Sequence, residues 1–208
     1  MKKILNEFIG SFFWTLAMVI CLLGSAGQFT ALAVGGIVMA LVFAGGHISG
    51  AHYNPATTIA VWLRGKCNVR DVPLYIFAQL LSAAVAALIA DSILLHKLGD
   101  AQYPKGDALA IIFAELLGTF ALVYTVLNVA TTKDTSGNSF YGLAVGGIVM
   151  AGIFSIGSIT GGAFNPAVAL GLSISKIVPF SSIWLYWIGE LIGGVSAAYA
   201  FIFINGKE

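Results

Sequence analysis

Long apolar stretches separated by short polar stretches run through most of this 208-residue sequence. A membrane-spanning helix needs roughly 17 to 25 predominantly apolar residues, because each residue advances the helix by about 1.5 Å. Six stretches meet that length if two of them continue into the loops that follow, whereas two others, 55–63 and 166–173, are about half as long. The pattern predicts an all-α membrane protein with six transmembrane helices and two half-helices. The six long stretches are 4–23, 31–47, 72–95, 109–130, 141–156 and 183–204.

The two halves of the sequence repeat each other. The run Leu32-Ala33-Val34-Gly35-Gly36 recurs 111 residues later from Leu143, and Asn54-Pro55-Ala56 recurs at the same offset as Asn165-Pro166-Ala167. Each half holds three spanning stretches, and because three is odd, the second half enters the membrane from the opposite side. We therefore predict inverted repeats, about 1–100 and 108–208, within a single domain of residues 1–208.

Composition and charge agree with a membrane protein. Hydrophobic residues make up 59% of the chain and charged residues 9%, against roughly 25% charged residues in an average soluble domain. The net charge of +1 supplies no positive field for nucleic acid. Seven basic residues fall on one side of the predicted topology and three on the other, so we expect a cell (plasma or inner) membrane protein with both termini cytosolic. The seven are Lys2, Lys3, Arg64, Lys66, Arg70, Lys133 and Lys207, and the three are Lys97, Lys105 and Lys176.

The two half-helices carry the candidate chemistry. Asparagine is a good N-cap and proline is favoured at the first helical position, so Asn54-Pro55 and Asn165-Pro166 predict helix starts. In an inverted repeat the two starts meet near the membrane midplane, where each presents a positive helix end and an amide N–H₂ donor. We expect the segments before them, 50–53 and 161–164, to be extended and to offer carbonyl acceptors. This combination suits a file of small neutral molecules and repels cations.

Three acidic residues, Glu7, Glu115 and Glu190, lie within apolar stretches, where an ionisable group suggests a functional site. One role is proton relay; the other is to brace the irregular backbone before each half-helix with hydrogen bonds. The symmetric placement of Glu7 and Glu115 favours bracing, whereas Glu190, which Gln79 matches in the other half, stays open between the two.

Two histidines flank the irregular segment before the first half-helix. We expect His47 to tie its loop to a neighbouring helix, and His52 is a candidate pH gate. No group of His, Cys and Asp residues has the spacing of metal ligands, and no order of Ser, His and Asp suggests catalysis. We therefore expect no metal, no cofactor and no enzymatic activity.

These features resemble the aquaporin, or major intrinsic protein, family over the whole chain. The resemblance rests on the two Asn-Pro-Ala motifs on half-helices, on the run 46–50 that leads to the first motif, and on Glu7 and Glu115 in the first helix of each half. It implies an aquaporin-like fold in which each subunit has its own pore, and a homotetramer in the lipid bilayer.

One position departs from most members of that family. They place arginine directly after the second Asn-Pro-Ala, at the narrowest constriction, where this sequence has Val168; the other constriction positions match Val34, Ile153 and Gly162. In water-selective members two of these positions are commonly an aromatic residue and histidine. The resemblance therefore implies a selectivity filter that is wider and more apolar than in a strict water channel. Ala169 also stands where many glycerol facilitators have aspartate.

The sequence favours a passive channel for water and small neutral solutes such as glycerol, ammonia, peroxide or undissociated metalloid acids. Asn54 and Asn165 are expected to orient the permeant, and Val34, Ile153, Gly162 and Val168 to set its size limit. Two alternatives stay open. One is an ion- or proton-leaky pore, because the filter lacks arginine; the other is a membrane scaffold whose pore is occluded, because apolar rings can close by dewetting.

Overall fold

The computed structural model describes residues 1–24, 26–94 and 102–206, and all regular secondary structure in these residues is helical. The six long helices are α1 (Lys2–Leu23), α2 (Thr30–Ser49), α4 (Asp71–Ile89), α5 (Ala108–Ala130), α6 (Tyr141–Thr160) and α8 (Ile183–Asn205). The two half-helices are α3 (Pro55–Leu63) and α7 (Pro166–Ile174). The predicted fold class is confirmed.

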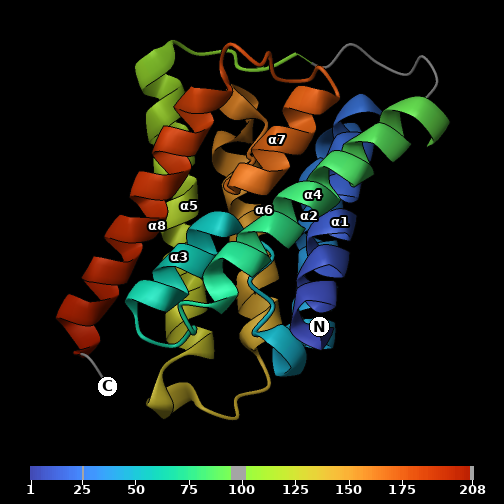
Figure 1. Cartoon of the computed structure of the whole chain (residues 1–208). Coiled ribbons are helices and arrows are strands. Elements are labelled where there is room, and N and C mark those ends of the chain that lie inside the picture. The colour runs from blue at the N-terminus through green and yellow to red at the C-terminus, as the bar shows by residue number, and fades with distance from the viewer. Residues whose placement is uncertain (25, 95–101, 207–208) are drawn as a thin grey trace.

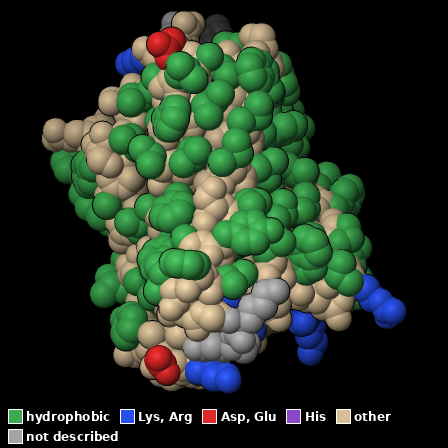
Figure 2. All heavy atoms as spheres, turned by 90° about the vertical axis from the view of Figure 1, so that its left-hand side faces the viewer, with side chains coloured by type: hydrophobic (Ala, Val, Ile, Leu, Met, Phe, Trp, Pro, Cys, Tyr) green, Lys and Arg blue, Asp and Glu red, His purple; other side chains and the backbone are tan. Residues whose placement is uncertain are grey.

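All six long helices are apolar and long enough to cross a membrane. Helices suit that environment because every backbone hydrogen bond inside them is satisfied within the same segment. Figure 2 shows apolar side chains over the middle of the face formed by the left-hand side of Figure 1, with charged side chains at the two ends of that face. The chain is therefore a multi-pass membrane protein.

Helices α2 and α6 run further than the predicted stretches 31–47 and 141–156. Both end at a glycine in the left-handed region, Gly50 (φ 90°) and Gly161 (φ 88°), whose N–H donates to the carbonyl four residues earlier. Glycine tolerates this conformation because it has no Cβ. Regular α4 ends earlier than predicted, at Ile89, where a π-helical turn, Ala90–Leu94, follows. Residue 95 and the first half of the polar run 96–107 lie outside the described residues.

The two half-helices lie end to end inside the bundle. In Figure 1, α3 points toward the end that carries both chain termini, and α7 points toward the other end. α3 packs against α8, α4 and α5, and α7 packs against α4, α1 and α8, so each half-helix contacts both halves of the chain. These contacts hold the first residues of both half-helices in the interior.

Glycines bring the backbones of α2 and α6 into direct contact. A Cβ added to Gly146 would lie 2.5 Å from the carbonyl oxygen of Gly35, and one added to Gly35 would lie 2.7 Å from that of Gly146. Both distances are too short for a carbon next to an oxygen, and a backbone atom cannot turn away as a side chain can. The spacing of these helices therefore depends on glycine at both positions.

We expect Gly146→Ala to lower the stability of the protein and Gly147→Ala to raise it slightly. A Cβ at Gly147 has no atom within 4 Å, so the second variant is a matched control for the gain in helix propensity. Overpacking at Gly146 costs roughly 1–3 kcal/mol. Thermal unfolding in detergent, followed by circular dichroism, measures the difference; equal midpoints for the two variants would contradict the contact.

Candidate pore and selectivity filter

Each half-helix begins with the same cap. The side-chain oxygen of Asn54 accepts from the backbone N–H groups of Ala56 (2.8 Å) and Thr57 (3.4 Å), and that of Asn165 accepts from Ala167 N–H (3.0 Å). A proline follows each cap as the first helical residue, where its missing N–H costs no hydrogen bond. Both asparagines are fully buried.

The two caps are also bonded to each other's segments. Asn54 Nδ2 donates to the carbonyl of Phe164 at 2.8 Å, and Asn165 Nδ2 donates to the carbonyl of Tyr53 at 2.9 Å. Since an amide nitrogen carries two hydrogens, one N–H of each asparagine is left for another acceptor. The positive ends of the two helix dipoles thus converge at one place in the interior, with an amide donor beside each.

The segments before the half-helices are not extended, which corrects the prediction for 50–53 and 161–164. Ala51 (φ 51°), Tyr53 (φ 50°) and Phe164 (φ 50°) adopt the left-handed region, as do Gly50, Gly161 and Gly162. A non-glycine residue in this region costs roughly 1–2 kcal/mol. Hydrogen bonds from outside the segments stabilise this backbone, and the rings of Tyr53 and Phe164 occupy the space that a Cβ would fill at Gly10 and Gly118.

Glu7 holds the first of these segments. Its carboxylate accepts four hydrogen bonds, from Ser49 Oγ (2.5 Å), His52 N–H (3.0 Å), Tyr53 N–H (2.7 Å) and Gln79 Nε2 (2.8 Å). The glutamate is fully buried. The backbone N–H groups therefore turn toward α1, which leaves the carbonyl of Tyr53 free to accept from the opposite asparagine.

Glu115 holds the second segment in the same manner. Its two carboxylate oxygens accept from Ala163 N–H (3.3 Å) and Phe164 N–H (2.7 Å). Glu190 adds a bond that the first half lacks, because its Oε1 accepts from Asn165 N–H at 2.9 Å. Both glutamates are fully buried.

Several residues of these networks were not singled out by the sequence analysis. Tyr75 donates to the carbonyl of Ser49 (3.0 Å), and Tyr186 donates to the carbonyl of Thr160 (2.8 Å). Tyr75 and Tyr186 lie 111 residues apart, as do Ser49 and Thr160, so the equivalence of polar residues between the halves is the signal that could have identified them. Asn6, which donates to Ser49 Oγ at 2.7 Å, has no such counterpart, because Ala114 stands at the corresponding position.

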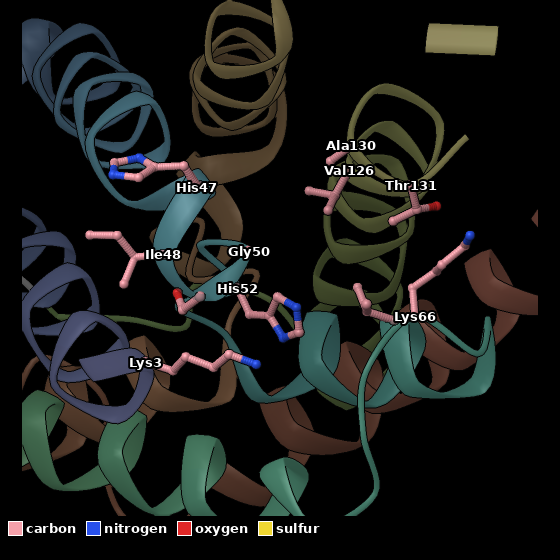
Figure 3. A pocket seen from close by; sticks show the side chains of 12 residues that line it. Lys3, His47, Ile48, Gly50, His52, Lys66, Val126, Ala130 and Thr131 are labelled. Carbon is pink, nitrogen blue, oxygen red and sulfur yellow. The ribbon is translucent and has the colours of Figure 1, made fainter. Parts of the chain in front are cut away.

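His47 does not tie a loop to a neighbouring helix, which corrects that prediction. It belongs to the last turn of α2 rather than to a loop, and within the described residues no hydrogen bond of its side chain is found. It lines two adjoining cavities of about 290 and 590 Å³. His52 lines the smaller one, together with Lys3 and Lys66 (Figure 3), and its Nδ1 lies 3.2 Å from Thr58 Oγ1.

These cavities open at the end of the bundle that carries the termini. The larger one reaches inward to Val42 on α2 and Val145 on α6. Further along the same two helices lie Val34 and Ile153, two of the predicted filter residues. The cavities therefore form a vestibule that leads toward the predicted filter.

The structure brings the four predicted filter residues into the interior. Val34, Ile153 and Val168 belong to one buried apolar cluster, and Val34 and Val168 are fully buried. Gly162 is also buried, and a Cβ added to it would lie 3.0 Å from Ile153 Cγ1. The four side chains supply no charge, no ring and no hydrogen-bond donor.

Six spanning helices around two half-helices with converging positive ends define a polytopic channel of the inverted-repeat class. The model of the family described as Major intrinsic protein matches residues 1–201. Aquaporin AqpM of Methanothermobacter thermautotrophicus is 33% identical over 99% of this chain and 98% of its own, and aquaporin NIP1-1 of Zea mays is 32% identical over 98% of this chain and 75% of its own. The chain belongs to the major intrinsic protein family. It is a passive channel for water and small neutral solutes, not an enzyme.

The fold has a counterpart among solved structures. The X-ray structure of the aquaglyceroporin from Plasmodium falciparum superposes with a TM-score of 0.80 at 24% identity, covering 96% of this chain and 94% of that one. At this identity the match concerns the fold alone.

Proposed function

We propose that the channel has an apolar filter formed by Val34, Ile153, Gly162 and Val168, wide enough for small neutral solutes larger than water. The observation that carries this proposal is Val168, a buried apolar residue directly after the second Asn-Pro-Ala motif. Without a charged side chain there, the size of the opening alone sets the limit. Glycerol, ammonia, peroxide and undissociated metalloid acids are the permeants this filter suits.

The pore motifs have distinct roles in this proposal. Asn54 and Asn165, fixed by the capping turns that begin with Pro55-Ala56 and Pro166-Ala167, orient the permeant with their second amide N–H groups. Glu7 and Glu115 support the loops that carry those asparagines. The hydrogen bonds of the two carboxylates to four backbone N–H groups support this role.

The assembly and orientation follow the family pattern in this proposal. The whole chain acts as one channel domain, four copies form a homotetramer, and both termini face the cytosol of a cell that carries the channel in its plasma or inner membrane. The position of both termini at one end of the bundle supports a common side (Figure 1), and the excess of Lys and Arg predicted for that side supports the cytosol.

Stopped-flow light scattering on proteoliposomes tests the proposed permeant. With sucrose outside, we expect faster shrinkage than in empty vesicles; with glycerol outside, rapid shrinkage followed by rapid reswelling. Shrinkage without reswelling would mean a water channel with too narrow a filter for glycerol. No acceleration with either osmolyte would favour an occluded pore, and a conductance in planar bilayers would favour the ion-leaky alternative.

A further inference from the structure

The two halves of the channel differ at one buried position that the duplication makes equivalent. In the first half, Gln79 donates from Nε2 to Glu7 Oε2 (2.8 Å) and to Thr58 Oγ1 (2.9 Å). In the second half the same position is Glu190, its neighbour is Glu115, and Ala169 replaces the threonine. The second half thus pairs two carboxyl groups, Glu190 and Glu115, where the first half pairs the Gln79 amide with the Glu7 carboxylate.

Glu190 lacks donors for one of its oxygens. Its Oε1 accepts from Asn165 N–H, whereas Oε2 is buried and no donor of the described residues reaches it. The carboxyl group of Glu115 lies beside it, because Glu115 accepts from Ala163 and Phe164 N–H, the two residues before Asn165, and a Cβ added to Gly189 would lie 3.0 Å from Glu115 Cβ. An ionised carboxylate only accepts, so a hydrogen bond between the two groups needs one proton on one of them.

The helices packed against α8 within the described part of the chain, α3, α5 and α7, carry no positive charge that would stabilise two carboxylates. Of the elements packed against α8, α3 and α7 carry no titratable side chain, and α5 presents Glu115. On α8 itself the titratable group near Glu190 is Tyr186, and Tyr103 lies next to Tyr186. The guanidinium of Arg64 lies over the ring of Phe201, which is three helical turns away from Glu190. Two like charges side by side in such a buried site cannot both persist.

We propose that Glu190 is a positioning residue which shares one proton with Glu115, donating in place of the Gln79 amide and accepting from Asn165 N–H. The shared proton lets one side chain hold both the glutamate that braces segment 161–164 and the backbone of the second pore asparagine. The first half obtains the equivalent bracing from a permanent donor, and so it does not depend on a proton.

Infrared spectroscopy of the channel in lipid tests the proton directly. Wild type is expected to show the C=O stretching band of a protonated carboxyl group at neutral pH, and Glu190→Gln is expected to lack it. The Gln79→Glu variant, which builds the same acid pair in the first half, is the matched control and should gain a band of this kind. Identical carboxyl regions in wild type and Glu190→Gln would overturn the proposal.

Permeability against pH tests the positioning role, which rests on the proposed place of Asn165 in the pore. At neutral pH, Glu190→Gln should permeate solute like wild type, whereas Glu190→Leu, which offers no hydrogen bond, should lose several-fold. As the pH is raised, wild type should lose permeability when the shared proton leaves, and Glu190→Gln should not. Full activity of Glu190→Leu, or the same pH profile for wild type and Glu190→Gln, would overturn the role.

The infrared and permeability measurements test different claims, so each can be refuted without the other. A wild-type protein without permeability at any pH would refute the proposed channel function and leave the infrared result intact. A missing carboxyl band in an active channel would refute the shared proton alone.

Discussion

The Glu7→Ala variant is expected to yield no folded channel. Removal of the carboxylate leaves three donors without an acceptor, namely Ser49 Oγ and the buried N–H groups of His52 and Tyr53, and it takes from Gln79 Nε2 one of its two acceptors. Each donor without an acceptor destabilises the protein by roughly 1–3 kcal/mol. Together these losses approach the free energy of unfolding of a typical domain, roughly 5–15 kcal/mol. The yield of monodisperse protein in size-exclusion chromatography, with the thermal midpoint of any folded fraction, measures the effect.

Two further variants show whether the loss comes from the hydrogen bonds. Leu5→Ala removes a side chain from the same helix that is 60% exposed, and it should leave the midpoint near that of wild type. Glu115→Ala removes the acceptor of only two backbone N–H groups, those of Ala163 and Phe164, so its loss of stability should be smaller than that of Glu7→Ala. If Glu7→Ala were as stable as Leu5→Ala, the carboxylate would not be what holds the first segment.

The sequence predicts the architecture well because the controlling interactions are local or repeated. Length and apolarity define spanning helices, and Asn followed by Pro defines a helix start whose capping bonds lie within three residues. The duplication then supplies what local patterns cannot, since equivalent residues such as Tyr75 and Tyr186 occupy equivalent places. The inverted topology follows from counting helices.

The backbone conformation of the pore segments could not be predicted from the sequence. Tyr53 and Phe164 have low intrinsic preference for the left-handed region, and they adopt it because Glu7 and Glu115 bind their N–H groups from helices more than 40 residues away. The bonds from each asparagine to the opposite carbonyl join residues more than 100 positions apart. The bonding of His47 was predicted wrongly for a related reason, because the neighbours of a side chain at the end of a helix depend on packing in the bundle.

The Val168→Arg variant is expected to lose glycerol permeation while it keeps part of the water permeation. Val168 is fully buried in the apolar cluster that contains Val34 and Ile153, so an arginine there adds length and a permanent charge to the lining of the filter. A barrier raised by 1.4 kcal/mol already slows passage about tenfold, and the loss for glycerol should be at least of this order. Stopped-flow reswelling in glycerol, beside shrinkage in sucrose, gives the two rates.

The Val168→Met variant separates length from charge, because methionine is long and unbranched but neutral. If narrowing alone limits glycerol, the methionine variant should fall between wild type and Val168→Arg, and water should be affected less than glycerol in both. Where wild type conducts ions, the arginine variant should lose that conductance and the methionine variant should keep it, since only a fixed positive charge repels cations. Glycerol permeation at the wild-type rate in Val168→Arg would mean that this position does not line the narrowest part of the pore, and the size limit would then have to be sought elsewhere along α2 and α6.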